Sequence, residues 1–284
     1  AWWPDFRTDA PNFRAAGKRR LRDTLYSLCD QRFSLAEKLI ARAAPDFLML
    51  VDMGVDPIHH AFWKPMAPRH PQYEPESPFV TAIHDYYVHV DQRIGELLKQ
   101  CDEDTAVLVV SDHGAQPLMG GICINEWLIE NGYLTLKESP TEVLPLDKVE
   151  VDWSQTKVWG AGGYYARIFL NVKGREPEGT VGMGEYEALR NELTEKLSQL
   201  TDPEGNLLDV KVFKPQEIYQ KVRGRAPDLI VYFDDLAWRS VGSVGINSIH
   251  TVENDTGPDD ANHAPFGLMI FHDPKDPKGG QVLE

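Results

Sequence analysis

The sequence predicts an α/β fold, with a mostly parallel sheet that is flanked by helices. Two apolar runs, residues 47–53 and 106–110, have the composition of strands buried on both faces. The stretch between them, residues 79–101, repeats apolar residues with the 3.6-residue period of a helix. Strand, helix and strand in this order form a βαβ crossover. We therefore expect parallel neighbouring strands, with the loops that follow them at one edge of the sheet.

Length and composition restrict the class of protein. The 284 residues suffice for one large α/β domain or two small ones, and 42% of them are hydrophobic, enough for a sizeable core. Acidic residues outnumber basic ones 44 to 29, so the net charge is −15, which disfavours a general nucleic-acid binder with a basic face. No apolar run approaches the roughly 18 residues of a membrane span. We expect neither a nucleic-acid nor a membrane partner.

The cysteines and the start of the sequence predict a cytoplasmic location. Cys29, Cys101 and Cys123 are odd in number and show no C-x-x-C spacing, which is typical of reduced thiols in an intracellular protein. Residues 1–30 are charged throughout and contain no signal peptide.

The elements before the second apolar run follow from local signals. Aromatic residues and arginines without a clear period predict an irregular arm over residues 1–20. Residues 34–42 are expected to form a short helix with Ser34 as its cap. The proline-rich residues 64–78 predict a loop, in which we expect His70 to lie at the surface.

The rest of the chain is expected to add a peripheral lobe with edge strands, residues 115–225, to a single domain that spans residues 1–284. Helices are predicted over residues 124–133 and 185–200, and residues 239–249 are predicted to form a loop. The glycines of residues 158–172 lack a phosphate-loop signature, so we prefer a hairpin or bulge between two strands. Further strands are expected over residues 209–213, 229–233 and 267–271.

Candidate metal ligands follow both apolar runs. Asp112 and His113 end the second run within the sequence S-D-H-G, although they could also be a turn cap and a surface histidine. Asp56 and His60 follow the first run and are four residues apart, so on a helical turn they share one face. Pro57 after Asp56 is also a helix-start signal, and both interpretations can hold together. Carboxylate oxygen and imidazole nitrogen are ligands that suit zinc and similar ions.

A third candidate segment precedes the last predicted strand. His250 and His263 both lie near an acidic loop, and we prefer His263 because it is next to the strand and would be held rigidly. Two aspartates and three histidines are too many for one tetrahedral ion with an open position. They are nearly right for two ions ~3.5–4 Å apart, an arrangement that serves phosphoryl chemistry.

The combined pattern resembles the alkaline phosphatase superfamily. D-x-x-x-H, then S-D-H-G after an apolar strand, then a late N-H before a final strand carry the resemblance. VDPIHHAFW, INEWLIENGYL and GPDDANHAPFGLMIF are similar to its type I phosphodiesterase/nucleotide pyrophosphatase-like branch of phosphohydrolases and phosphomutases, over most of the chain. The resemblance implies an alkaline phosphatase-like α/β/α sandwich. It also implies two divalent metal ions, with zinc preferred and manganese or iron as alternatives. One ion would be held by Asp56, His60 and His263, and the other by Asp112 and His113.

One part of the family pattern is missing. In the family, an earlier strand ends in a metal-binding aspartate, and a Thr or Ser nucleophile follows at the start of a helix. Thr8, Thr24, Ser27 and Ser34 are the early hydroxyl residues, and none follows a strand that ends in Asp. We therefore expect an N-terminally incomplete chain without a catalytic nucleophile and with reduced or no activity. An exposed groove or compensating association is expected in place of the central strand.

The predicted function is that of a metal-dependent phosphoric ester hydrolase of the phosphodiesterase/nucleotide pyrophosphatase type. Its substrate would be a small phosphate ester or a nucleotide. A phosphomutase of the same superfamily is one alternative. The other is a non-catalytic binding domain that keeps the fold, which the missing nucleophile favours.

Overall fold

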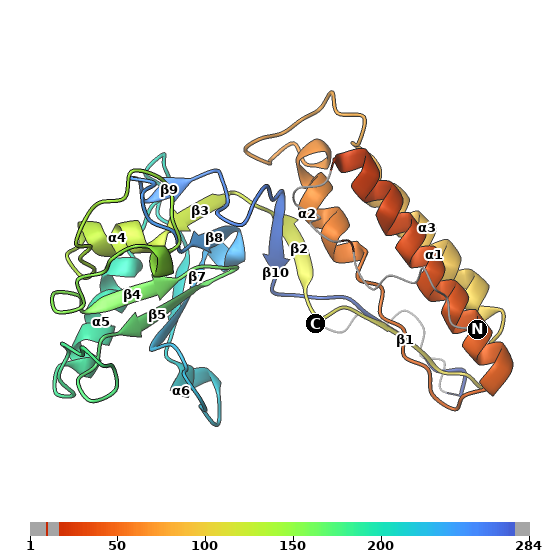
Figure 1. Cartoon of the computed structure of the whole chain (residues 1–284). Coiled ribbons are helices and arrows are strands. Elements are labelled where there is room, and N and C mark those ends of the chain that lie inside the picture. The colour runs from red at the N-terminus through yellow and green to blue at the C-terminus, as the bar shows by residue number, and fades with distance from the viewer. Residues whose placement is uncertain (1–9, 11–16, 276–284) are drawn as a thin grey trace. The chain divides into compact units, whose positions relative to one another are not determined.

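The computed structural model describes residue 10 and residues 17–275, which form a mixed α/β structure (Figure 1). The chain divides into two compact units. Unit 1 comprises residues 1–117 and 258–284, and unit 2 comprises residues 118–257. The single domain with a lobe at residues 115–225 stays a prediction.

Three helices form the core of unit 1: α1 (Lys18–Ala43), α2 (Val55–Met66) and α3 (Ala82–Leu98). The helix predicted over residues 34–42 is therefore only the end of α1, and Ser34 lies inside it rather than at its cap. Apolar residues keep the helical period from Leu21 onward, which is why α1 begins so early. Of the arm predicted over residues 1–20, positions 1–9 and 11–16 lie outside the described residues. The buried side chains that these helices share are Leu21, Leu25, Cys29, Phe33, Ile58, Phe62, Ala82, Ile83 and Tyr86.

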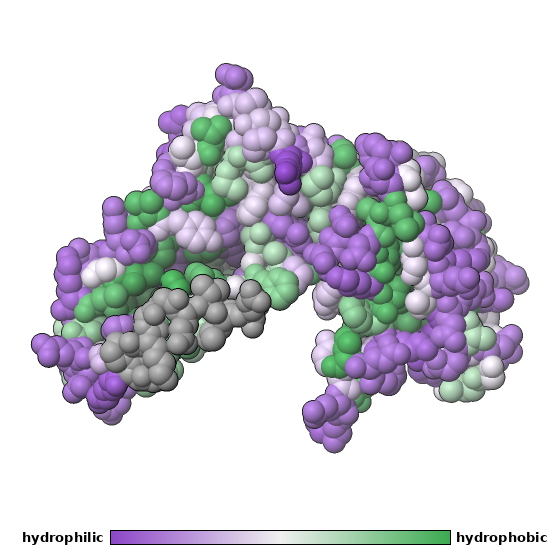
Figure 2. All heavy atoms as spheres, turned by 180° about the vertical axis from the view of Figure 1, so that it is seen from behind, coloured by the Kyte–Doolittle hydropathy of each residue, from purple (hydrophilic) through white to green (hydrophobic). Residues whose placement is uncertain are grey.

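The apolar runs of unit 1 are exposed, which corrects two predictions. Residues 47–53 belong to no strand, and Phe47 is 81% exposed. The second run forms β1 (Val107–Val110), which pairs antiparallel with β11 (Met269–His272), and Val110 is 64% exposed. The predicted βαβ crossover is therefore wrong. Figure 2 shows apolar surface, in green, on this unit (left in that view).

A second two-stranded ribbon carries histidines. β2 (Gly114–Pro117) pairs antiparallel with β10 (Ala261–Ala264), and His263 lies opposite Ala115. The pairing brings the segment after β1 next to a segment almost 150 residues further along the chain. Gly114 is needed for close approach, because a Cβ atom there would overlap the carbonyl oxygen of Phe266.

Unit 2 contains a seven-stranded sheet in the order β4-β5-β7-β8-β3-β9, with β6 paired to β7. Its parallel ladder joins β3 to β8, whereas the other ladders of the described sheet are antiparallel. The expectation of a mostly parallel sheet is therefore wrong, and the sheet is mixed. Short connections such as residues 162–165 between β4 and β5 allow only antiparallel pairing. The strands are β3 (Gly120–Cys123), β4 (Val158–Ala161), β5 (Ala166–Leu170), β6 (Val210–Phe213), β7 (Leu229–Phe233), β8 (Trp238–Val241) and β9 (His250–Thr251).

Helices flank this sheet and complete the core of unit 2. α4 (Ile124–Glu130) and α5 (Tyr186–Leu197) confirm the predicted helices, and Leu193 and Leu197 are buried in the same cluster as residues of β5 and β7. The strand pair within residues 158–172 and the strands near 209–213 and 229–233 are confirmed as well. The predicted loop over 239–249 is partly wrong, because β8 ends at Val241. Short elements complete the unit: η1 (Leu146–Lys148), α6 (Pro215–Ile218) and η2 (Asp234–Leu236).

The helices described in residues 17–275 are too short or too polar to cross a membrane.

Candidate metal centre

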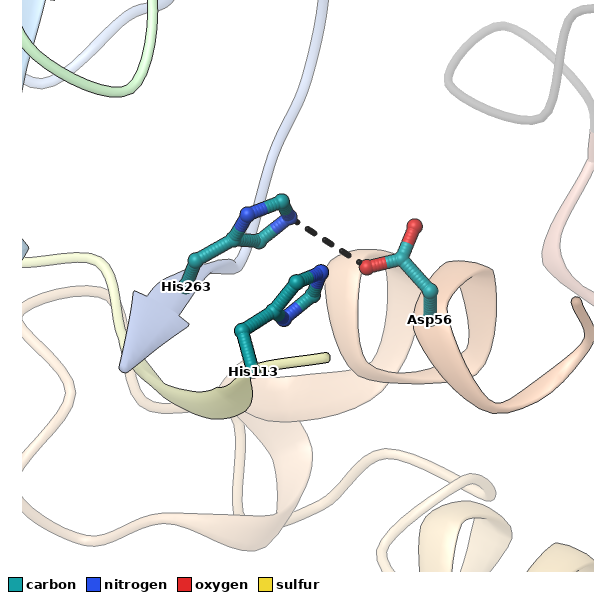
Figure 3. A group of neighbouring side chains, drawn as sticks. All are labelled: Asp56, His113 and His263. Atoms are coloured by element: carbon teal, nitrogen blue, oxygen red, sulfur yellow. Dashed lines mark ion pairs between the residues drawn. The ribbon is translucent and has the colours of Figure 1, made fainter. Parts of the chain in front are cut away.

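Four side chains of unit 1 converge at one place. Asp56 and His60 come from α2, His113 immediately precedes β2, and His263 lies in β10. Figure 3 shows Asp56, His113 and His263 directed toward one another from these three elements. One ligand atom from each of these three residues lies within 4.8 Å of the others.

The start of α2 presents the first pair. The four-residue interval places Oδ1 of Asp56 3.3 Å from Nε2 of His60, so both side chains lie on one helical face as predicted. Gly54 precedes the helix, and a Cβ atom there would overlap the hydroxyl of Tyr86 in α3. The first turn of α2 therefore packs tightly against α3, which fixes the position of Asp56 and His60.

The β2–β10 ribbon presents the other two histidines. Their rings stack with centroids 3.6 Å apart and an interplanar angle of 14°. Nδ1 of His113 donates to the carbonyl oxygen of Gly114 at 2.9 Å, so its Nε2 is the nitrogen left for a ligand. The side-chain amide of Gln116 donates to the carbonyl oxygen of His263 at 2.9 Å and ties the two strands together at the site.

Three donor atoms of this group fit a single divalent ion. Oδ1 of Asp56 is 3.3 Å from Nε2 of His60 and 3.4 Å from Nε2 of His263, and the two histidine nitrogens are 3.4 Å apart. Ligands that hold zinc tetrahedrally at ~2.0–2.1 Å are roughly 3.3–3.4 Å from one another. One carboxylate oxygen with imidazole nitrogens is also a chemically suitable donor set for zinc.

Asp56 and His60 perturb each other's pKa at this place. Burial raises the pKa of Asp56, but hydrogen bonds from His263 and His60 outweigh it and hold the pKa far below its usual value. Burial lowers the pKa of His60, but its bonds to Asp259 and Asp56 outweigh this and raise the pKa to about 9. Asp56 is therefore ionised throughout the physiological range. Burial lowers the pKa of the adjacent His59 to about 4, so this ring is neutral.

Some predicted residues lie elsewhere. The side chain of Asp112 is 90% exposed, with Oδ1 3.6 Å from Nε2 of His113, so it lies at the margin of the group. His250 lies in unit 2, where its Nε2 bonds to the carbonyl oxygen of Thr201 at 2.6 Å. The surface location predicted for His70 is wrong, because the residue is 5% exposed and its Nε2 bonds to the carbonyl oxygen of Asp260.

Asp259 contacts the centre but was not among the residues predicted from the sequence. Its side chain is fully buried, and Oδ1 lies 2.6 Å from Nδ1 of His60. The sequence holds one signal for it: the interval from Asp259 to His263 repeats the interval from Asp56 to His60. The sequence by itself predicts only an acidic loop for this segment.

Comparison with known proteins identifies the family. The sequence profile described as type I phosphodiesterase/nucleotide pyrophosphatase matches residues 2–259, which include Asp56, His60, Asp112 and His113 and end just before His263. No curated protein and no solved structure gives a significant match. The profile covers most of the chain and confirms the resemblance found in the motifs. The chain therefore belongs to the type I phosphodiesterase/nucleotide pyrophosphatase family, within the alkaline phosphatase superfamily.

Proposed function

We propose that this protein is a metal-dependent phosphoric ester hydrolase that acts on a small phosphodiester or a nucleotide. The observation that carries the proposal is the triangle of Asp56 Oδ1, His60 Nε2 and His263 Nε2, with sides of 3.3–3.4 Å. Family membership supports hydrolysis of phosphate esters as the reaction. The triangle supports a divalent ion, zinc by preference and manganese or iron as alternatives, as the required cofactor.

Each residue has a defined part in this proposal. Asp56, His60 and His263 would hold the first ion, while His113 and Asp112 would hold a second. When bound, a divalent ion polarises a phosphoryl oxygen and offsets the charge that grows as the ester bond breaks. The carboxylate of Asp56 stays ionised, because its pKa is held low, and so offers a charged oxygen to an ion. His60, 2% exposed in its side chain, presents Nε2 from a position that water barely reaches.

The early hydroxyl residues do not supply a nucleophile in this arrangement. The hydroxyl of Thr24 donates to the carbonyl oxygen of Arg20, and Ser27 accepts a bond from Gln31, both within α1. The hydroxyl of Ser34 accepts a bond from Arg93. Thr8 lies outside the described residues. We therefore propose that the covalent step, if the chain performs one, uses none of Thr24, Ser27 and Ser34.

Metal content and activity test the proposal together. The purified chain is loaded with Zn²⁺ or Mn²⁺, desalted and analysed for bound metal, and hydrolysis of bis(p-nitrophenyl) phosphate is then followed. We expect at least one ion per chain, and the ion held by Asp56, His60 and His263 should be lost in His263→Ala. It should be kept in His84→Ala, a control on α3 whose side chain is 75% exposed. A second ion that disappears in Asp112→Ala would support the two-metal arrangement.

The outcomes separate the alternatives. Metal-dependent release of nitrophenol supports the hydrolase. Metal binding without turnover of this or any other phosphate ester supports the non-catalytic domain, which the exposed side chain of Asp112 favours. A phosphomutase stays a prediction, and product analysis distinguishes it because phosphate would move within one substrate without release. Failure of the wild-type chain to bind either ion would contradict metal dependence.

A further inference from the structure

Asp259 holds His60 in a fixed orientation. Its Oδ1 lies 2.6 Å from Nδ1 of His60, and its side chain is fully buried, as is nearly all of the His60 side chain. A carboxylate accepts hydrogen bonds but cannot donate them, so the proton of this bond belongs to His60 Nδ1. That proton leaves Nε2, on the opposite side of the ring, as the nitrogen that faces Asp56 and His263.

The backbone around Asp259 is anchored to the same helix. The amide N–H of Asp260 donates to the carbonyl oxygen of His60 at 2.8 Å. The carboxylate of Asp260 pairs with Lys18 at 3.1 Å and with Lys64 at 3.3 Å. Lys18 also donates to the carbonyl oxygen of Ala61 at 2.6 Å. Residues 259–260 are thus fastened to α2 by several bonds, so the Asp259 carboxylate has little freedom to move away from His60.

The same segment continues directly into His263. Four residues after Asp259, β10 places Nε2 of His263 3.4 Å from Nε2 of His60. The two D-x-x-x-H intervals at this site, Asp56–His60 and Asp259–His263, therefore act differently. In the first, the side chains of Asp56 and His60 both face Nε2 of His263. In the second, His263 faces Asp56 and His60, while Asp259 contacts Nδ1, on the far side of the His60 ring.

We propose that Asp259 is a positioning residue that fixes the tautomer and orientation of His60, so that Nε2 of His60 is presented to a divalent ion shared with Asp56 and His263. This inference rests on the proposed metal dependence. Carboxylates that bond to the far nitrogen of a metal-binding histidine typically change metal affinity 10- to 100-fold when they are removed. Because Asp259 bonds to Nδ1 of His60, we expect its effect on the ion to pass through His60.

Zinc affinity in a double-mutant cycle tests the inference. The dissociation constant of Zn²⁺ is measured by competition with a chromophoric chelator for wild type, Asp259→Ala, His60→Ala and the double variant. We expect Asp259→Ala to weaken binding about 10- to 100-fold. In the His60→Ala background, the same substitution should change the affinity less than about 2-fold, because nothing is left to position. Asp259→Asn keeps an acceptor for the Nδ1 proton and should give an intermediate loss.

Asp228→Asn is the matched control, because it removes a buried carboxylate of unit 2 that pairs with Arg175 and not with a histidine. It should lower the melting temperature of the metal-free protein while leaving the zinc affinity within about 2-fold of wild type. The visible spectrum of the Co²⁺-loaded protein gives a second readout. Asp259→Ala should alter the d–d bands, which report ligand geometry, and Asp228→Asn should leave them unchanged.

The failures are distinguishable. If the wild-type chain binds no Zn²⁺, both the proposed metal dependence and the role of Asp259 are overturned. If the wild-type chain binds Zn²⁺ and Asp259→Ala binds it equally well, only the role of Asp259 is overturned. Equal losses in both backgrounds, or unfolding of both Asp259 variants by circular dichroism, would make Asp259 a purely structural residue.

Discussion

β7 of unit 2 and β1 of unit 1 have similar apolar sequences but opposite environments. β7 reads Leu-Ile-Val-Tyr-Phe, pairs with β5, β6 and β8, and buries all of its residues except Tyr232. β1 reads Val-Leu-Val-Val, pairs with β11, and exposes every second residue. The residue types favour an extended conformation in both. The burial of a strand depends on how many strands and helices pack around it, and this number cannot be predicted from the local sequence.

Truncating one phenylalanine in β7 and one in β11, the strand that pairs with β1, should give the largest contrast. Phe233 in β7 is fully buried, whereas Phe271 in β11 is 60% exposed. Phe233→Ala should lower the free energy of unfolding by about 3–5 kcal/mol through lost burial and a cavity. Phe271→Ala should change it by less than about 1 kcal/mol. Urea unfolding followed by circular dichroism measures both. An equal loss for Phe271→Ala would show that β11 is covered in solution, and the contrast would be broken.

Zinc should stabilise unit 1 selectively, since the proposed ligands all belong to it. At a free ion concentration 100 times the dissociation constant, binding adds about 2.7 kcal/mol to the folded state. Hydrogen exchange should therefore slow for amides of α2 and β10 and remain the same for amides of β7. Chelation with EDTA should reverse the effect, and His263→Ala should abolish it. If hydrogen exchange slowed equally in both units, the two units would unfold together in one cooperative transition.

The cysteines report the two units separately. Burial raises the pKa of Cys29 in unit 1 and of Cys123 in unit 2 to about 12, so neither is a thiolate near pH 8. Cys101 is partly exposed and should react first with a thiol reagent. We expect Cys123 to react last, because we expect the opening of unit 2 to require more free energy than the opening of unit 1. Each additional 1.4 kcal/mol should slow the labelling of Cys123 about tenfold relative to Cys29. Mass spectrometry of labelled peptides gives the order, and faster labelling of Cys123 than of Cys29 would reverse it.

Charged substitutions on β1 should have the smallest effect on stability. Leu108 and Val110 are 57% and 64% exposed, so Leu108→Lys with Val110→Lys should change the free energy of unfolding by about 0.5 kcal/mol or less. The double variant should nevertheless bind less of an apolar dye and associate less, because an exposed apolar patch is removed. Val143→Lys, at a 52% exposed position of unit 2, is the control. Loss of folding in the β1 variant would indicate a hidden partner for that strand.

Periodicity predicted the helices better than composition predicted burial. α3, α4 and α5 follow their apolar stripes, and the hairpin of β4 and β5 follows its glycine-containing turn. Residues 47–53 were wrongly expected in a strand, since an apolar run signals an extended chain but does not supply a neighbour to pair with. The mixed sheet of unit 2 was missed for a related reason: strand direction depends on distant pairings that no local pattern encodes.

The part of the candidate site that could be predicted from the sequence is the part whose residues are close together in the chain. Asp56 and His60 share a helical face, as their interval requires. His263 was chosen over His250 for its place before the final strand, and the structure brings His263, not His250, to within 3.4 Å of Asp56. Asp112 follows the motif but points outward, because a strand end fixes where a residue lies and not how its side chain turns. Asp259 was missed because its partner is 199 residues away.

The pairing of β2 with β10 has a consequence for the order in which the protein can come apart. Unit 2 is inserted between Pro117 and Pro258, and the 140 residues from 118 to 257 form a loop whose ends are joined where Ala261 pairs with Pro117. Closing an unstructured loop of that length costs about 4 kcal/mol of chain entropy, whereas a folded insertion has already lost most of that freedom. Unfolding of unit 2 should therefore loosen the ribbon and separate His263 from Asp56, although neither residue belongs to unit 2. Folding of unit 2 should therefore stabilise a site whose proposed ligands all belong to unit 1.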